Sequence, residues 1–489
     1  MMFDKPRVRY APSPTGEPHV GNIRTALFDW LISKKYDGKF IIREEDTDQA
    51  RIINGAMNQQ EESLRWLGLN WDEGLGTTGD YGPYVQSKRI GLYHEFAEKL
   101  LLSGNAYKCF CSKERLDELR GIQNNSKSSF IGYDGKCKNN IGDSYYPKEE
   151  CVIRFNMPDS GKSVIADLVR GNIEFNNSLM EDFVILKSDC YPTYHFASVI
   201  DDHLMRISIV IRGEEWLSSL PRHIQIYEAF GWEIPQFAHL PTILAMDKTK
   251  LSKRHGATSI LEFKADGYLP EAMINFLSLL GWSIDGEKEI ISVTDLIQKF
   301  DISTLNSSGA VFDKEKLNWM NGYYIRNKND YELGNILFEY WQEYPPEVFE
   351  WQPTLMETIQ IVPLISQRLK TLGEAASWVS FLYKKEIHYD IEELIEKSTV
   401  TIAQKVVDIA LIELEKLEYF ESDKIEELLR TIFFEEEIKT GVFLGIIRLA
   451  TSGQKISPPI FQSLEILGKQ RTLRFLKNCQ SLIQVFNTY

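Results

Sequence analysis

The chain has 489 residues with a formal net charge of -15 at pH 7, and 43% of its residues are hydrophobic. Its length exceeds the roughly 250 to 300 residues at which a single core stops growing, so we expect two to four domains. The acidic charge argues against an indiscriminately basic nucleic-acid binder but leaves room for a nucleic-acid enzyme with local basic patches. The sequence lacks a long apolar run and a signal segment, so we expect a cytoplasmic protein that has no membrane partner.

The first hundred residues alternate between strand-like and helix-like patterns. The segments VRYA (8–11) and KFIIRE (39–44) predict short buried strands. Between them, the loop APSPTGEPHVGN (11–22) is followed by apolar residues at helical spacing. Strand, loop, helix and strand in this order predict a βαβ unit over a parallel sheet. A second helix is expected at about 55–68.

The pattern changes twice further along the chain. Polar sequence from about 108 to 150 predicts an insertion with its own loops, and strand-like segments return at CVIRF, EDFVILKS and RISIVIRGEEW. After about residue 260 helical periodicities dominate, as in the apolar series from Leu355 to Leu372. Because proline lacks a backbone N–H, we expect Pro363 to start or bend a helix and not to lie in its interior.

The proline-rich loop ends where the first predicted helix begins. Free backbone N–H groups and the positive end of the helix dipole favour phosphate at such a position. Gly21 lets a planar base approach the backbone there, and His19 can donate a hydrogen bond to a phosphate. A second segment, DKTKLSKRHG (247–256), carries Lys250 and Lys253, and mobile lysines suit a triphosphate that releases pyrophosphate. Either segment alone also fits an ordinary surface loop.

Together the two segments resemble the HIGH and KMSKS signatures of class I aminoacyl-tRNA synthetases. RYAPSPTGEPHVGN, IIREEDTDQAR, VIRGEEWLSSLPRH and VFDKEKLNWMNGYYI are similar to bacterial-type glutamyl-tRNA synthetases, and the similarity covers essentially the whole chain. The resemblance implies a ligase that uses ATP with Mg²⁺ to convert L-glutamate to glutamyl-adenylate. It then transfers glutamyl to the terminal adenosine of tRNA(Glu). The alternative is a non-discriminating enzyme that also charges tRNA(Gln), and the expected form is a monomer.

The resemblance also implies a fold class and a domain order. We expect an α/β Rossmann-type (HUP) catalytic domain with an α/β insertion, followed by all-α stem-contact and anticodon-binding domains. The expected boundaries are 1–87 and 195–246 for the catalytic domain, 88–194 for the acceptor-end-binding insertion, 247–330 for the KMSKS loop and helical stem-contact domain, and 331–489 for the all-helical anticodon-binding region.

Site roles follow from the same resemblance. The expected catalytic residues are His19, Lys250 and Lys253. The expected ATP site consists of His19, Gly21, Asn22, Glu215, Lys250 and Lys253. The expected glutamate site consists of Arg9, Ala11, Ser13, Glu45, Tyr194 and Arg212. Arginines bind carboxylates bidentately and disfavour the amide of glutamine. Asn22 replaces the last His of the HIGH signature, and its own role stays open.

Each arginine also has a simpler explanation. Without the surrounding motif, Arg9 would be a surface charge on an edge strand. In the same way, Arg212 would be a structural partner of Glu214 or Glu215. The motif favours the binding role for both.

Two further sites are expected outside the catalytic motif. Cys109, Cys111 and Cys137 can supply three thiolates to a structural, tetrahedral Zn²⁺ site. The resemblance offers Tyr133 as the fourth ligand, and a metal-free knuckle with reduced cysteines is the alternative. Arg368 stands where the family contacts anticodon bases, with a plain surface residue as the alternative.

Other functions explain the sequence less well. A glutaminyl-tRNA synthetase would carry β-barrels in place of the helical C-terminal third and would lack the Arg of VIRGEEW. A truncated relative that glutamylates a modified tRNA base would lack the C-terminal half. A nucleotidyltransferase for a small acid gives no reason for the long helical region after KLSKR. A catalytically inactive tRNA-binding module would not need His19, Lys250 and Lys253 together.

Overall fold

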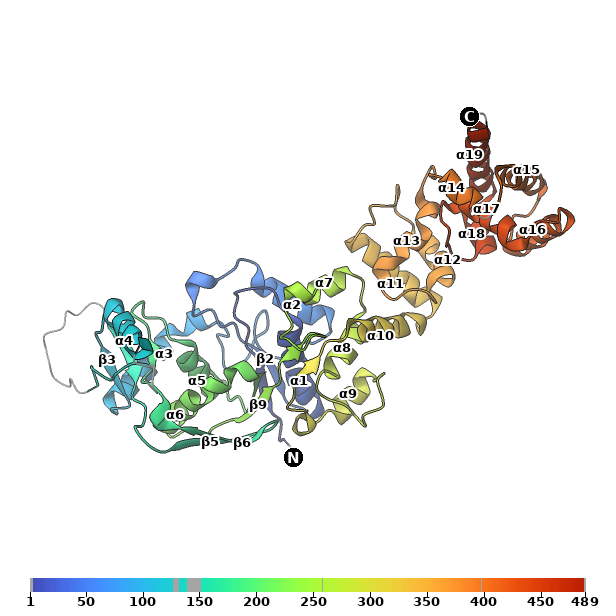
Figure 1. The fold of residues 1–489 in the computed structure, drawn as a ribbon. Coiled ribbons are helices and arrows are strands. Elements are labelled where there is room, and N and C mark those ends of the chain that lie inside the picture. The colour runs from blue at the N-terminus through green and yellow to red at the C-terminus, as the bar shows by residue number, and fades with distance from the viewer. Residues whose placement is uncertain (1–2, 126–131, 139–150, 257, 397, 488–489) are drawn as a thin grey trace. The chain divides into compact units, whose positions relative to one another are not determined.

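The computed structural model consists of two compact units (Figure 1). It describes residues 3–125, 132–138, 151–256, 258–396 and 398–487. The first unit comprises Met1–Phe263 and Pro270–Lys314, and the second comprises Lys264–Leu269 and Glu315–Tyr489. Among the described residues, none of the helices has both the length and the apolar character required to span a membrane.

The first unit contains all the described strands, most of them short. They are β1 (Arg7–Tyr10), β2 (Lys39–Ile42), β3 (Ala106–Cys109), β4 (Val152–Phe155), β5 (Lys162–Asp167), β6 (Gly171–Asn176), β7 (Val184–Leu186), β8 (Ile209–Gly213), β9 (Gln236–Leu240), β10 (Ile243–Leu244) and β11 (Ala310–Val311). Its helices are α1 (Val20–Lys35), α2 (Ala56–Trp66), α3 (Ile90–Leu102), α4 (Lys113–Asn125), α5 (Tyr194–Leu204), α6 (Leu220–Phe230), α8 (Pro270–Ser278) and α9 (Val293–Lys299). Helices α7 (Ile260–Ala265) and α10 (Lys314–Arg326) cross the boundary between the units.

The predicted βαβ unit is confirmed. β1 and β2 pair in parallel with Val8 opposite Phe40, and α1 connects them and packs against both. β8 begins beside β1, because the Ser208 N–H donates to the Arg7 carbonyl at 3.0 Å. A four-stranded sheet continues in the order β8, β9, β5, β6. Arg9 and Arg212 lie in the last half of β1 and β8, and Glu45 follows β2. These predicted glutamate-binding residues are therefore at the carboxyl ends of the strands, where open α/β sheets bind ligands.

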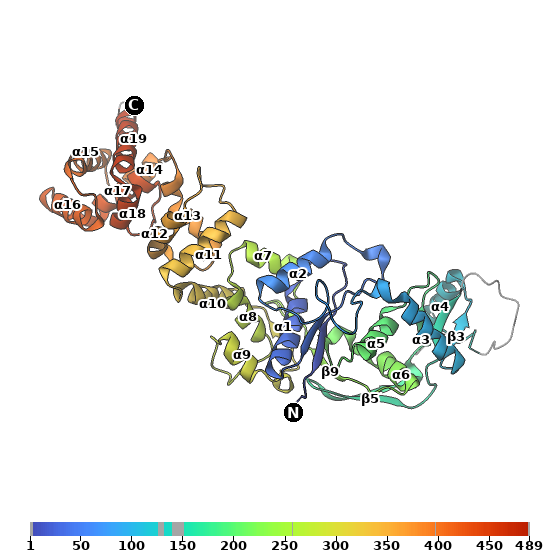
Figure 2. The same cartoon turned by 180° about the vertical axis from the view of Figure 1, so that it is seen from behind.

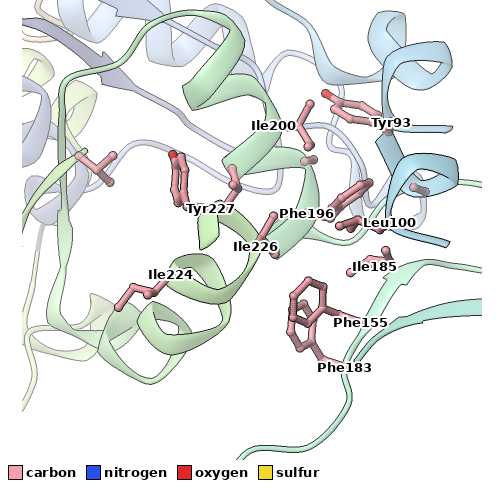
Figure 3. Close-up of a cluster of buried hydrophobic side chains, with 14 of the residues drawn as sticks. Tyr93, Leu100, Phe155, Phe183, Ile185, Phe196, Ile200, Ile224, Ile226 and Tyr227 are labelled. Carbon is pink, nitrogen blue, oxygen red and sulfur yellow. The ribbon is translucent and has the colours of Figure 1, made fainter. Parts of the chain in front are cut away.

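A buried apolar cluster holds α3, α5 and α6 against β4 and the segment around β7 (Figure 3). Its labelled members are Tyr93, Leu100, Phe155, Phe183, Ile185, Phe196, Ile200, Ile224, Ile226 and Tyr227. Phe155 stacks on Phe183 with ring centroids 5.4 Å apart. Full burial of such side chains contributes about 1.5–3 kcal/mol each. The cluster fixes the first turn of α5, which carries Tyr194, next to the sheet.

The insertion in the first unit has its own small sheet. β3, β4 and β7 pair in that order as antiparallel strands. Both views place β3 and α4 at the far end of this unit from α9 (Figures 1 and 2). Within the stretch expected to be an insertion, Lys113–Asn125 forms α4. Residues 126–131 and 139–150 lie outside the described structure.

In the second unit the predicted dominance of helices is confirmed for the described residues. Its helices after α10 are α11 (Asp330–Glu343), α12 (Leu355–Ile365), α13 (Ala375–Val379), α14 (Ile391–Ile395), α15 (Val400–Lys416), α16 (Ser422–Glu435), α17 (Thr440–Ser452), α18 (Ile460–Leu467) and α19 (Lys469–Asn487). α19 packs against α15, α17 and α18, which makes the C-terminal part a helical bundle.

The expected position of Pro363 is wrong. Pro363 lies inside α12, two residues before the last residue of that helix. The missing N–H removes one hydrogen bond, but buried Ile361, Val362 and Ile365 pack this last turn in the unit. The apolar series that continues to Leu372 therefore does not form a single helix, because α12 ends at Ile365.

Candidate active site

The loop after β1 leads directly into the N-terminus of α1. His19 is the N-cap residue, and its Nδ1 accepts hydrogen bonds from the N–H groups of Gly21 at 3.1 Å and Asn22 at 3.4 Å. A ring nitrogen that accepts carries no proton, so the neutral imidazole holds its proton on Nε2. A Cβ at Gly21 would lie 2.9 Å from Cε1 of His19. Gly21 thus leaves room for the capping ring.

The two signature segments meet through backbone hydrogen bonds. The Val20 N–H donates to the Thr258 carbonyl at 3.0 Å, and the Ile260 N–H donates to the Pro18 carbonyl at 3.2 Å. The segment before this contact folds back on β10, where Lys250 pairs with Leu244. The lysine-containing loop is thereby fixed at both ends beside the first turn of α1.

The electrostatics of His19 reflect this proximity. Desolvation by the surrounding protein and the nearby Lys250 ammonium lower the pKa of His19, and the Glu215 carboxylate acts in the opposite direction. The imidazole is therefore neutral at pH 7 and presents Nε2–H as a hydrogen-bond donor. Such a donor, next to a cation and a helix N-terminus, suits phosphate oxygens.

A cavity of about 930 Å³ opens at this point of the first unit. That size falls within the 300–1,000 Å³ of small-molecule sites. Residues predicted to bind ATP or glutamate line it as follows: Arg9, Ala11, Ser13, His19, Gly21, Asn22, Glu45, Tyr194, Arg212, Glu215 and Lys250. Lys253 belongs to the same prediction, but its side chain lies outside the described part of the structure.

Arg9 is buried, so the alternative that it is a surface charge is wrong. Its Nε donates to Asp202 Oδ1 at 3.0 Å, and Arg43 Nη1 donates to the same oxygen at 2.7 Å. Arg43 also donates to Glu45 Oε1 at 2.8 Å. Buried charges need such partners, because leaving one unpaired is costly. Sequence reasoning did not single out Arg43 or Asp202, although both flank the predicted site.

Glu45 is held with one carboxylate oxygen toward this network. Both hydrogen bonds from Arg43 end on Oε1, at 2.8 and 3.3 Å. Burial raises the pKa of Glu45, although the Arg43 guanidinium partly offsets that effect. Glu45 is buried and lines the cavity, so its carboxylate can accept hydrogen bonds from a cationic ligand group.

Arg212 is buried at the end of β8. Its Nη1 donates to the Tyr194 hydroxyl at 3.3 Å, and the Tyr194 ring lies on Trp216 with centroids 4.3 Å apart. Glu214 instead pairs with Arg170 and accepts a hydrogen bond from the Thr242 N–H at 2.7 Å. The Arg212 guanidinium bonds to His239, Tyr194, His223 and Trp216. Among the described residues, Arg212 forms no ion pair with Glu214 or Glu215, so the alternative that it is their structural partner is wrong.

The three predicted zinc-ligating cysteines lie together in the insertion. The sulfur atoms of Cys109, Cys111 and Cys137 all lie within 4.8 Å of one another. The hydroxyl of Tyr133 lies 3.5 Å from Sγ of Cys109 and 3.7 Å from Sγ of Cys111. This donor set can hold a metal ion, and all three cysteines are free thiols.

Arg368 follows α12 in the second unit and is exposed. Its guanidinium lies 5.1 Å from the centre of the Trp378 ring. Burial lowers the pKa of Arg448, and the charge of Arg368 lowers it further, so the two guanidinium groups lie near each other. The result is a local basic site on an acidic chain.

Fold and site together define a class I tRNA synthetase. The family described as "tRNA synthetases class I (E and Q), catalytic domain" matches residues 5–319, and the family "Anticodon binding domain" matches residues 337–479. A curated relative from Dehalococcoides mccartyi, named glutamate–tRNA ligase, is 47% identical over 474 residues and aligns over 96% of each chain.

Other relatives agree. The glutamate–tRNA ligase of Borreliella burgdorferi is 41% identical over 489 residues, which are 98% of this chain and 99% of that one. A crystal structure of a glutamate tRNA ligase from Elizabethkingia meningosepticum in complex with its amino acid is similar with a TM-score of 0.83. It is 32% identical in sequence, over 98% of this chain and 99% of that one. The chain belongs to the glutamate–tRNA ligase family.

Proposed function

We propose that this protein condenses L-glutamate with ATP and transfers the glutamyl group to tRNA(Glu). One observation carries the proposal: a single cavity is lined by an uncharged N-cap imidazole, a lysine, a carboxylate and a buried guanidinium. These are His19, Lys250, Glu45 and Arg212. The first two suit phosphates, and the last two suit the charged ends of an amino acid.

In the first step, an oxygen of the glutamate α-carboxylate attacks the α-phosphorus of ATP. A new P–O bond forms, and the bond to the β-phosphate oxygen breaks, so that pyrophosphate leaves with the electron pair. The substrate supplies the nucleophile, and the protein contributes positioning and charge stabilisation. His19 donates Nε2–H to a phosphate oxygen, while Lys250 and Lys253 stabilise the charge that develops. A Mg²⁺ ion bound to ATP would neutralise part of the phosphate charge.

In the second step, a ribose hydroxyl of the terminal adenosine of tRNA attacks the carbonyl carbon of glutamyl-adenylate. The new ester bond forms, AMP leaves with the electrons of the mixed-anhydride bond, and the phosphate of the departing AMP takes up the proton of the hydroxyl. No residue of the chain becomes covalently attached. The protein contributes by aligning the hydroxyl with the carbonyl carbon of the adenylate.

Selection for glutamate follows from opposite charges at the two sides of the cavity. Glu45 accepts from the α-ammonium, and Arg212 donates to the side-chain carboxylate with help from the Tyr194 hydroxyl. Arg9, Ser13 and the Ala11 backbone complete the pocket. A glutamine amide would place its NH₂ donors against the N–H donors of Arg212. The missing hydrogen bonds would weaken glutamine binding by a few kcal/mol.

Glutamate-dependent ATP–pyrophosphate exchange, measured with tRNA present, tests the proposal. Absence of exchange with tRNA present would contradict the function. Arg212→Ala is expected to raise the glutamate KM far more than the ATP KM, and equal effects would point to a folding defect. Charging of purified tRNA(Glu) and tRNA(Gln) side by side distinguishes the discriminating enzyme from the alternative.

We also propose that the cysteine cluster binds a structural Zn²⁺ through Cys109, Cys111, Cys137 and Tyr133. In a tetrahedral site with Zn–S bonds of about 2.3 Å, sulfur atoms lie about 3.8 Å apart. The sulfur atoms of Cys111 and Cys137 are 3.6 Å apart, which is compatible with this geometry. The ion would tie the loop-rich insertion together.

Arg368 is proposed to contact the anticodon. Its exposure, its cation–π contact with Trp378 and the neighbouring Arg448 support the proposal, because a flat, cationic surface of this kind can stack on a base and attract phosphate. Arg368→Ala is expected to raise the KM for tRNA while the glutamate and ATP KM values stay the same. A change in the amino-acid KM alone would contradict this role.

A further inference from the structure

Arg212 belongs to a hydrogen-bonded chain that crosses three strands. The parallel register of β8 and β9 places Arg212 opposite His239. Arg212 Nε lies 2.9 Å from His239 Nε2, and His239 Nδ1 lies 2.7 Å from Asp167 Oδ2 at the end of β5. His239 is 0% exposed and Asp167 4% exposed. Nothing in the sequence pattern connects these three residues, because the sheet order alone brings them together.

The permanent charge of Arg212 fixes the direction of every hydrogen bond in this chain. A guanidinium only donates, so His239 Nε2 must be the unprotonated nitrogen that accepts. The ring proton then lies on Nδ1, from which it is donated to Asp167. Burial lowers the pKa of His239, although Asp167 opposes this effect. The ring is thus a neutral connector between a carboxylate and a guanidinium.

Asp167 is anchored independently of Arg212. Its carboxylate accepts hydrogen bonds from the backbone N–H groups of Val169 at 2.9 Å, Arg170 at 3.0 Å and His239 at 3.1 Å. Burial alone would raise the pKa of Asp167, but the His239 ring and the N–H groups of Val169 and Arg170 lower it. The carboxylate therefore stays ionised and provides a fixed end for the chain.

The other contacts of Arg212 are longer. Its Nη1 lies 3.3 Å from His223 Nδ1 and from the Tyr194 hydroxyl, and its Nη2 lies 3.4 Å from the Trp216 carbonyl. Since hydrogen bonds of this type are usually near 2.9 Å, the contact with His239 is the firmest of the four. The hydrogen bond with His239 uses the Nε–H of Arg212. The Nη groups, whose contacts are longer, can then donate to a ligand carboxylate.

We propose that His239 and Asp167 are positioning residues that orient the Arg212 guanidinium for the side-chain carboxylate of glutamate. The inference rests on the proposed role of Arg212 in glutamate binding. Neither residue lines the cavity, so neither needs to touch the substrate. At metal sites, removing a partner that orients a ligating side chain costs about 10- to 100-fold in affinity, and we use the lower end of that range for Arg212.

Asp167→Asn is the sharpest variant, because it keeps the shape and inverts the hydrogen bonds. The backbone N–H groups of Val169 and Arg170 hold the amide oxygen, so the NH₂ group faces the His239 ring and also loses the hydrogen bond from the His239 N–H. The ring then accepts at Nδ1 and carries its proton on Nε2, which opposes the Nε–H of Arg212. His239→Leu removes the acceptor, whereas His239→Gln restores it with an amide oxygen. Ser163→Ala is the matched control.

Ser163 lies on the same strand β5, is buried, and donates to Asn177 Oδ1 at 2.7 Å without contacting Arg212. Initial-rate aminoacylation with varied glutamate and varied ATP measures the effect. We expect Asp167→Asn and His239→Leu to raise the glutamate KM about tenfold while the ATP KM changes less than about twofold. His239→Gln recovers most of the loss, and Ser163→Ala has the wild-type KM values.

Three results would overturn the inference: an unchanged glutamate KM in Asp167→Asn, parallel increases of both KM values, or no recovery in His239→Gln. If a variant does not fold, ¹⁵N NMR of the wild-type histidines decides instead, because a proton on Nε2 of His239 would exclude the chain of hydrogen bonds. The proposed function fails separately. It is wrong if Arg212→Ala itself leaves the glutamate KM unchanged, whereas a strong Arg212→Ala effect without an Asp167→Asn effect refutes the positioning role alone.

Discussion

Replacing Gly21 with alanine should separate catalysis from stability. The new Cβ would lie 2.9 Å from Cε1 and 3.0 Å from Nδ1 of His19, so the ring must shift. The shift weakens the hydrogen bonds that the ring accepts from Gly21 and Asn22, and losing an N-cap costs about 1 kcal/mol. Alanine offsets this loss by up to about 1 kcal/mol through its helix propensity. The free energy of unfolding should therefore change by less than about 1 kcal/mol.

Activity should respond far more strongly. A displacement of about 1 Å at a reacting centre can cost roughly 100-fold, so kcat/KM for ATP in pyrophosphate exchange with tRNA present is expected to fall about 100-fold. The melting temperature should shift by no more than about 4 °C. Gly91→Ala is the control, because Gly91 is likewise the second residue of a helix (α3), does not line the cavity, and has no heavy atom within 4 Å of an added Cβ. Wild-type kcat/KM in Gly21→Ala would refute the reasoning, as would an equal loss in Gly91→Ala.

Three further variants test other parts of the first unit. Lys250→Ala removes an ammonium that lowers the pKa of His19. NMR should therefore show a higher pKa for His19, and ATP–pyrophosphate exchange should be slower. An unchanged titration of His19 would contradict the proximity of the two residues. Asp202→Asn should lower the free energy of unfolding by about 3 kcal/mol at pH 7, because two buried guanidinium groups lose a shared carboxylate. Burial alone would raise the pKa of Asp202, but these arginines lower it. The difference in free energy of unfolding between the wild type and Asp202→Asn should therefore be constant from pH 8 to 5 and decrease only as the pH falls through about 3.9. Urea unfolding in which this difference decreases above pH 5 would contradict the expectation. Cys111→Ser should abolish bound zinc in metal analysis, whereas the exposed Cys190→Ser should retain it; equal metal content would contradict the site.

Predictions of helices and strands that depend only on residues close together in the sequence agree with the structure, with one exception. The helix after the proline-rich loop begins at Val20 because His19 caps it, and the strands on either side pair in parallel. The exception is Pro363, whose cost inside α12 is outweighed by the burial of the residues around it. Local propensity is a weak guide at such a position, because tertiary packing determines whether the helix continues.

The sequence by itself determined the family, since the order of the two signature segments and the fragments between them identifies it without any geometry. The sequence also predicted the residues of the ATP and glutamate sites, most of which line the cavity beside α1. Only the tertiary structure decided how those residues are held: Arg9 and Arg43 share Asp202, and Arg212 meets His239. The physical reason is that a helix cap depends on residues within one turn, whereas these partners meet through sheet order and strand register. The sequence pattern of a single strand carries no information on which neighbour lies beside it.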